Sequence, residues 1–150
     1  MSGALGPAPD LPRSPGAYAL LISLTRRTRL EISTLNEPVL AAGRYVYCGS
    51  ARGPGGLAAR VGRHLRRDKK RHWHVDHLTD AGRVLDVCCL ADCLADCLDR
   101  GGECAMVRSL RQIPGVTVPV MGFGSSDCGR CAAHLLKVPI DFTLSPQLFQ

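Results

Sequence analysis

A cluster of basic residues in the first half of the chain is the strongest candidate for chemistry. The chain has 150 residues and a net charge of +6, and eight basic residues and one acid lie between Arg52 and Arg71. Because the remainder is close to neutral, the electrostatic field of this stretch attracts polyanions. We therefore predict a binding surface for the phosphate backbone of a nucleic acid. Its predicted members are Arg52, Arg63, Arg66, Arg67, Lys69, Lys70, Arg71, His72 and His74.

Arg60 and His64 stand apart from this surface. They are four residues apart in a segment with helical periodicity, so their side chains share one helix face. The apolar stripe Leu57, Val61 and Leu65 lies beside that face, and we expect both side chains to point toward a sheet. A buried arginine requires a partner, because an unpaired charge is costly away from water. The alternative is that Arg60 is a solvated charge and that His64 reaches past its apolar neighbours to water.

Cysteines supply a second candidate site. The spacing Cys128-x2-Cys131-x2-His134 suits three zinc ligands, although no fourth ligand is obvious, and the alternative is a set of unliganded reduced thiols. Cys89, Cys93 and Cys97 recur at helical spacing, and we expect small buried residues there. The chain lacks a signal-peptide pattern and a run of about 20 apolar residues. We therefore expect a cytoplasmic protein with reduced cysteines.

The elements that must position these residues follow from the apolar pattern. Strands are predicted at 17–24, 44–49 and 83–90, and 134–138 could close a sheet edge. Helices are predicted at 57–67, at 72–78 and over most of 91–111. This order predicts an α/β fold with a small mixed, mainly antiparallel sheet of about three core strands and flanking helices.

A single domain is expected over residues 16–138. The Pro-rich residues 1–15 are predicted to be a disordered tail, and residues 139–150 a C-terminal tail. The glycine loop at 49–56 has neither P-loop spacing nor the three-glycine dinucleotide fingerprint. The sequence therefore does not support a nucleotide-cofactor fold.

Several short motifs occur in a characteristic order. Gly-x-Tyr lies at 16–18, Tyr-x-Tyr-x-Gly-Ser-Ala at 45–51 and Gly-Pro-Gly-Gly-Leu at 53–57. His-Trp-His follows at 72–74, and Gly-Phe-Gly-x-Ser-Asp-Cys at 122–128. Together they resemble the GIY-YIG nuclease superfamily, most nearly its small stand-alone Uri-type members. The resemblance covers roughly residues 16–112 and implies a GIY-YIG-like fold.

The resemblance also implies phosphodiester cleavage assisted by one Mg²⁺ or Mn²⁺ ion. In this scheme Tyr47 or Tyr18 orients or deprotonates the attacking water, and Arg60 stabilises charge on the phosphoryl oxygens. Glu103 holds the metal, and His64 supports the tyrosines or the phosphate. A hard cation with a mostly aqueous shell needs few protein ligands, which suits a single carboxylate.

Two departures from the family pattern leave alternatives open. The family's late asparagine has no clear counterpart, with Ser125, Ser126 and Asp127 the nearest candidates, and two glycines precede Glu103. The first hypothesis is a metal-dependent endonuclease acting on nucleic acid, DNA rather than RNA. The second is a nucleic-acid-binding module of the same fold without turnover. The third is a zinc-stabilised domain whose basic face binds an acidic protein.

Overall fold

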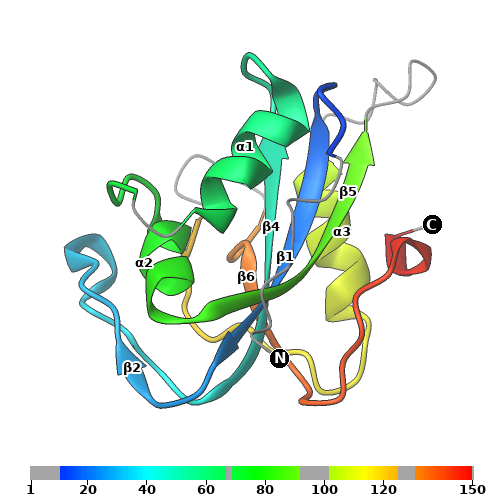
Figure 1. Cartoon of the computed structure of the whole chain (residues 1–150). Helices are drawn as coiled ribbons and strands as arrows, with labels where there is room; N and C mark the ends of the chain where they lie inside the picture. Colours follow the sequence, from blue (N-terminus) through cyan, green and yellow to red (C-terminus); the bar gives the residue numbers. More distant parts are fainter. Residues whose placement is uncertain (1–10, 67–68, 92–101, 125–130, 150) are drawn as a thin grey trace.

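Four antiparallel strands form one sheet at the centre of the fold (Figure 1). The structure is a computed structural model that describes residues 11–66, 69–91, 102–124 and 131–149. Across the sheet the strands are β5 (Arg83–Ala91), β1 (Gly16–Leu24), β4 (Gly43–Ala51) and β6 (Leu135–Val138). A separate ribbon pairs β2 (Thr28–Arg29) with β3 (Val39–Leu40), and the 3-10 turn η1 (Ser33–Leu35) lies between these two strands in the chain.

The central strand β1 is apolar on both faces because both faces are covered. Side chains alternate between the faces of a strand, so a strand buried on both sides has a continuous apolar run. Tyr18 and Leu20 join one core, whereas Ala17 and Leu21 join a second core on the opposite face. All four are at most 4% exposed. The run at 17–24 therefore predicted the strand correctly.

Three helices cover the two faces of the sheet (Figure 1). Helices α1 (Gly56–Leu65) and α2 (His74–Ala81) pack on the face of Tyr18, where Leu57, Val61, Val75 and Leu78 are fully buried. Helix α3 (Gly102–Arg111) packs on the opposite face through Met106, Val107 and Leu110. This arrangement confirms the predicted mixed α/β fold with a mainly antiparallel sheet and flanking helices.

Several predicted boundaries need correction. The predicted edge strand at 134–138 is confirmed as β6, which pairs with the outer side of β4 and adds a fourth strand to the predicted three core strands. Helix α1 ends at Leu65, two residues earlier than predicted, and α2 begins at His74 because the extended Trp73 is its N-cap. Cys89 lies in β5, as the predicted strand at 83–90 requires, so the helical spacing of Cys89, Cys93 and Cys97 does not place Cys89 on a helix. The other two cysteines lie outside the described residues.

The described parts of both predicted tails pack on the domain. The carbonyls of Pro12 and Ser14 accept hydrogen bonds from the backbone N–H groups of Ala58 and Leu57, at 2.7 and 3.0 Å. Near the C-terminus, the 3-10 turn η3 (Pro146–Phe149) contacts α3, and Leu144 is buried in the second core. The ordered domain therefore extends beyond 16–138 at both ends. Among the described residues, no helix is long and apolar enough to span a bilayer.

Candidate functional site

A buried hydrogen bond between Tyr18 and His64 lies at the centre of the candidate site. The Tyr18 hydroxyl on β1 is 2.7 Å from Nε2 of His64 on α1, and both residues are at most 2% exposed. The ring of Tyr47 on β4 lies 6.3 Å, centroid to centroid, from both of these rings. The structure thus brings both predicted tyrosines together with the predicted histidine.

Gly49 explains how Tyr18 can occupy this position. It pairs with Tyr18 across the β1–β4 ladder. A Cβ atom at Gly49 would lie 2.5 Å from the Tyr18 hydroxyl oxygen and 3.0 Å from a ring carbon of Tyr47. Real Cβ contacts are not this short, so the glycine is required by the packing of two aromatic rings. The Tyr-x-Tyr-x-Gly motif therefore has a local structural cause.

Burial controls the protonation of this group. Burial lowers the pKa of His64 to about 3, against a weaker opposing effect of Asp76, so the imidazole is neutral near pH 7. Burial also raises the pKa of Tyr18, with a further contribution from Tyr47, and the charge and hydrogen bond of Arg60 oppose this rise. If Nε2 accepts the Tyr18 proton, the ring proton of His64 sits on Nδ1, which is 3.9 Å from the Asp76 carboxylate. The site is therefore a neutral Tyr18–His64 pair beside the charged Arg63–Asp76 pair, and the 3.9 Å from His64 Nδ1 to Asp76 is beyond hydrogen-bond distance.

Asp76 on α2 is the anionic member of the charged pair. Its side chain is 0% exposed and accepts two hydrogen bonds from the Arg63 guanidinium, at 2.8 and 2.9 Å. The backbone N–H groups of His72 and Trp73 donate two more, at 2.6 and 2.9 Å. Although burial favours the protonated acid, these hydrogen bonds hold the pKa of Asp76 at about 2. The sequence did not indicate Asp76 as a site residue, and it placed Arg63 on the outer surface. The Arg63–Asp76 pair joins α1 to α2, so it depends on how these two helices pack.

Arg60 and Arg63 both pack on Trp73. Each guanidinium carbon lies 4.4 Å from the centre of the indole ring, which is cation–π geometry. Arg60 also donates to the carbonyl of Ser50 at 3.1 Å. Both arginines line a pocket at the start of α1 together with Ala51, Gly53, Pro54, Gly56 and Ala59. Arg60 thus lies in an open, basic pocket and packs on Trp73, whose ring is 6.0 Å from that of His64.

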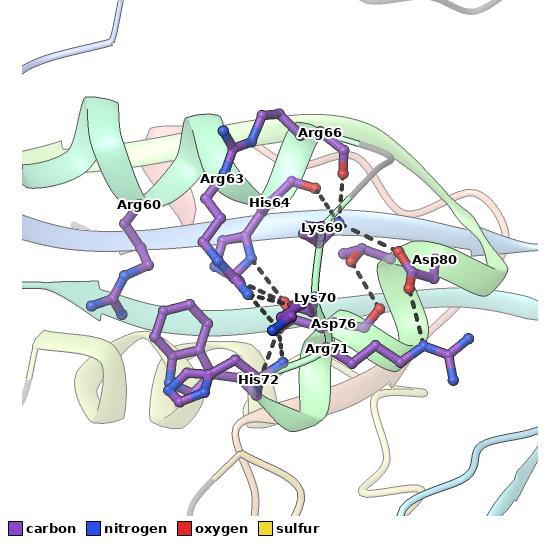
Figure 2. A network of polar contacts seen from close by, with 12 residues as sticks. Arg60, Arg63, His64, Arg66, Lys69, Lys70, Arg71, His72, Asp76 and Asp80 are labelled. Carbon is purple, nitrogen blue, oxygen red and sulfur yellow. Dashed lines mark hydrogen bonds and ion pairs between the residues drawn. The ribbon is translucent and has the colours of Figure 1, made fainter.

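Much of the predicted basic surface is committed to internal contacts (Figure 2). Lys69 has a side chain only 2% exposed, and its ammonium group caps the end of α1 through the carbonyl of Arg66 at 2.6 Å. Lys69 also lies 3.6 Å from Asp80, and Arg71 pairs with the same carboxylate at 3.1 Å. The prediction that Lys69 and Arg63 bind the nucleic-acid backbone is therefore corrected, because both side chains form ion pairs within the protein.

The remaining predicted members of the surface divide into three groups. Arg52, Arg66, Lys70, Arg71 and His72 are exposed. His74 is half-buried and accepts a hydrogen bond from the Gly124 N–H at 2.9 Å, so it holds a loop in place. Arg67 lies outside the described residues. The outward basic surface is thus smaller than the sequence predicted.

The glycine loop before α1 is shaped by packing. The N–H groups of Leu57 and Ala58, which an anion would need at the helix start, already donate to the carbonyls of Ser14 and Pro12. Gly56 has φ +57°, and the carbonyl oxygens of Arg13 and Ser14 leave no room for a Cβ atom there. The start of α1 is therefore occupied by the segment at 12–14.

Glu103 lies on α3, the helix that covers the opposite face of the sheet from Tyr18 and His64. It lies in the first turn of α3, is partly exposed, and follows Gly102, whose added Cβ would lie 3.2 Å from the side chain of Ala17 on β1. Burial raises the pKa of Tyr47, with smaller contributions from the Cys48 thiol and the Glu103 carboxylate, and Arg60 opposes the rise. Gly102 is the first residue of the helix, where the penalty for a glycine inside a helix does not apply.

A second cluster lies beside Glu103. Cys104 on α3, Cys131 and His134 place their ligand atoms within 4.8 Å of one another, and these three residues could hold a metal ion. The predicted set was Cys128, Cys131 and His134, and Cys128 lies outside the described residues. Sequence reasoning missed Cys104, because it lies far from the Cys-x2-Cys motif in the chain and is brought there only by the packing of α3.

Comparison with known families corrects the predicted relationship. Residues 17–148 match the family described as Domain of unknown function DUF123. No curated protein and no solved structure matches the chain. The predicted membership of the GIY-YIG superfamily is wrong, since the matching family is a distinct one. The motifs behind that prediction are short, and the packing of Gly49 accounts for one of them. The chain belongs to the DUF123 family.

Proposed function

We propose that this protein binds the sugar-phosphate backbone of a nucleic acid, DNA rather than RNA, and cleaves it as a metal-dependent endonuclease. The observation that carries the proposal is the position of Arg60: it lines an open pocket and packs on Trp73, whose ring lies 6.0 Å from that of His64 in the buried Tyr18–His64 pair. A cation that can contact a phosphate therefore lies near groups that can orient or accept a proton. Both features are needed to hydrolyse a phosphodiester.

Arg60 serves as the phosphate-binding cation. Its face is held by Trp73 and one of its N–H groups by the Ser50 carbonyl, so the guanidinium is fixed before a ligand arrives. A preorganised donor stabilises charge that develops in the transition state without reorganisation. Arg63 lines the same pocket, but its charge is balanced by Asp76. Arg60 therefore contributes most of the net positive charge at this point.

The tyrosines take different roles in this scheme. Tyr47 is 8% exposed and Tyr18 is 1% exposed, so an attacking water reaches Tyr47 first. Because burial raises its pKa, Tyr47 is a neutral phenol that donates a hydrogen bond and orients the water or a phosphoryl oxygen. His64 has a positioning role, because its Nε2 atom holds the Tyr18 hydroxyl by a buried hydrogen bond beside Tyr47.

Two kinds of metal fit two different sets of donors. The Glu103 carboxylate suits Mg²⁺ or Mn²⁺, which prefer oxygen ligands and retain water. When bound, such an ion supplies Lewis-acid stabilisation to the phosphate. The thiol and imidazole donors of Cys104, Cys131 and His134 instead suit Zn²⁺. We place the activity in the cytoplasm, where these thiols remain reduced.

A cleavage panel tests the proposal. Purified full-length protein is incubated with single-stranded, duplex and branched DNA and with RNA, each with Mg²⁺ or Mn²⁺. Metal-dependent products that disappear in Glu103→Gln and Tyr47→Phe variants are expected. Cleavage that persists equally in both variants, or no cleavage of any substrate, would contradict the enzymatic part of the proposal.

The second candidate function is binding of the sugar-phosphate backbone of a nucleic acid without cleavage. It is favoured by the position of Glu103 on α3, the helix that covers the opposite face of the sheet from Tyr18 and His64. This candidate predicts salt-dependent DNA binding with no cleavage in either metal. Binding measured alongside the cleavage panel separates the two functions.

A further inference from the structure

We propose that Cys104, Cys131 and His134 form a zinc site that fixes the first turn of α3, and with it Glu103. The part that concerns Glu103 rests on the proposed function, whereas the zinc site stands on its own geometry. Cys104 is the third residue of α3, and His134 immediately precedes β6. A metal bound to both would join the start of a helix to the edge of the sheet.

The geometry is close to that of a tetrahedral zinc site. Sγ of Cys104 lies 3.7 Å from Nε2 of His134, and all three ligand atoms lie within 4.8 Å of one another. Zinc bonds of about 2.0 Å to nitrogen and 2.3 Å to sulfur place neighbouring tetrahedral ligands roughly 3.5 Å apart. The cluster therefore needs its ligand atoms to move closer by at most about 1.3 Å to bind the ion.

The chemistry of the donors selects the metal. Two thiols and one imidazole bind Zn²⁺ well and Mg²⁺ poorly, because soft sulfur ligands do not suit a hard cation. Cys104 and His134 are 5% and 6% exposed, so the ion would be sheltered from bulk water. Three protein ligands leave one coordination position for a further ligand or a water.

His134 is already held in place for this role. Its backbone N–H donates to the Phe123 carbonyl at 2.8 Å, and its carbonyl accepts from the Cys48 N–H at 2.9 Å. These two bonds fix the main chain of His134 between β4 and the loop of Phe123. One ligand is therefore preorganised, and Cys104 is the ligand whose element depends on the metal.

A metal bound to Cys104 would restrain the start of α3. Two glycines precede Glu103, and glycine loses more conformational freedom on folding than other residues. A bond from the metal to Cys104 restrains this turn directly. Because Glu103 is the adjacent residue, the zinc ion sets the position of the carboxylate that binds the catalytic cation. Loss of zinc loosens the turn and displaces Glu103.

Metal analysis of the full-length chain tests the site. Protein purified under reducing conditions without chelator is expected to contain about one zinc ion per chain, the content of a single structural site. Cys104→Ser, Cys131→Ser and His134→Gln variants should lose it. Cys88→Ser is the matched control, since Cys88 is 5% exposed in the same core but outside the cluster, and should keep it. Equal zinc in the Cys88 and Cys104 variants would overturn the assignment.

Cobalt titration keeps the test independent of variants that fail to fold. Reduced, metal-free wild-type protein is titrated with Co²⁺, which gives intense thiolate-to-cobalt absorption when cysteines ligate it. Saturation at one equivalent, with displacement by Zn²⁺, is the expected result. Absence of the thiolate bands, together with absence of zinc in the purified protein, would overturn the site.

Hydrogen exchange separates this inference from the proposed function. Amides in the first turn of α3 should exchange faster by on the order of tenfold in metal-free protein than in zinc-loaded protein. Unchanged exchange there would overturn the link to Glu103 even if zinc binds. Zinc binding and protected α3 amides in a protein that cleaves nothing would leave the zinc site in place and reject the nuclease.

Discussion

The hydroxyl of Tyr18 and Nε2 of His64 lie 2.7 Å apart in a part of the core where neither residue is more than 2% exposed. Removing one partner leaves the other without its hydrogen bond in a buried position, which costs about 1–3 kcal/mol. We expect Tyr18→Phe to lower the free energy of unfolding by that amount in urea denaturation. Tyr47→Phe is the matched control, because the Tyr47 hydroxyl makes no hydrogen bond to another of the described residues. Equal losses in the two variants would contradict this role of the pair.

His64 should make stability depend on pH. Its folded pKa of about 3 lies below the unfolded value of 6.5, so between these values the unfolded chain binds the extra proton. The free energy of unfolding should therefore fall as the pH decreases from about 6.5, with a slope of up to about 1.4 kcal/mol per pH unit from this group. Thermal or urea unfolding of wild type and His64→Gln between pH 4 and 7 checks the slope. A variant with the wild-type slope would show that another group is responsible.

Arg63 and Asp76 form a buried ion pair, and breaking it should be expensive. Asp76→Asn leaves the Arg63 charge without its partner, and such losses cost about 3–5 kcal/mol. Arg29 and Glu37 provide a control, since they are 3.7 Å apart but 67% and 51% exposed. Glu37→Gln should change stability by less than about 1 kcal/mol. Chemical denaturation of both variants measures the contrast, and similar small effects would reject the structural role of Asp76.

Two glycines should respond to alanine in opposite directions. At Gly49 the new Cβ would lie 2.5 Å from the Tyr18 hydroxyl, so we expect a loss of about 1–3 kcal/mol from overpacking. At Gly62, in α1, nothing lies within 4 Å of the added atom, and alanine should stabilise the helix by about 1 kcal/mol. Melting temperatures of Gly49→Ala and Gly62→Ala decide the matter. A tolerated alanine at Gly49 would show that the tyrosines can move apart.

DNA binding should depend on the outward basic residues. Neutralising Arg66 and Lys70, which are exposed, should reduce the slope of log affinity against log salt by up to about 0.9 for each duplex phosphate that the protein no longer neutralises. Lys69→Gln should leave that slope unchanged and reduce stability, because the buried Lys69 ammonium caps α1. Titrations at several salt concentrations measure both effects. A larger change of slope from Lys69 than from the exposed pair would place the binding face elsewhere.

Local patterns in the sequence predicted most of the fold. The apolar runs located β1, β4 and β5, and the stripe Leu57, Val61 and Leu65 located α1, because periodicity reports burial directly. The approach of His64 to the sheet also followed from that stripe. Short elements were less predictable at their ends, since their boundaries depend on contacts such as those of Trp73 at the start of α2.

Features that depend on contacts between distant residues could not be predicted. Seven of the eight basic residues of one stretch, all but Arg60, are predicted to form one outward surface, yet Arg63 turns inward because Asp76 lies opposite on another helix. Cys104 joins Cys131 and His134 only after α3 packs on the sheet. The predicted family was also wrong, because short motifs that position glycine and tyrosine on paired strands can arise from packing alone.

The rate of DNA cleavage by Arg60→Gln tests the central claim most directly. Wild type, Arg60→Gln and the control Arg27→Gln, an exposed arginine in the turn after β1, are compared under single-turnover conditions with Mg²⁺. Loss of one preorganised charge-stabilising group should slow cleavage by about 100- to 1,000-fold, whereas Arg27→Gln should match wild type. Equal rates for Arg60→Gln and Arg27→Gln, or no cleavage by folded wild-type protein, would contradict the account.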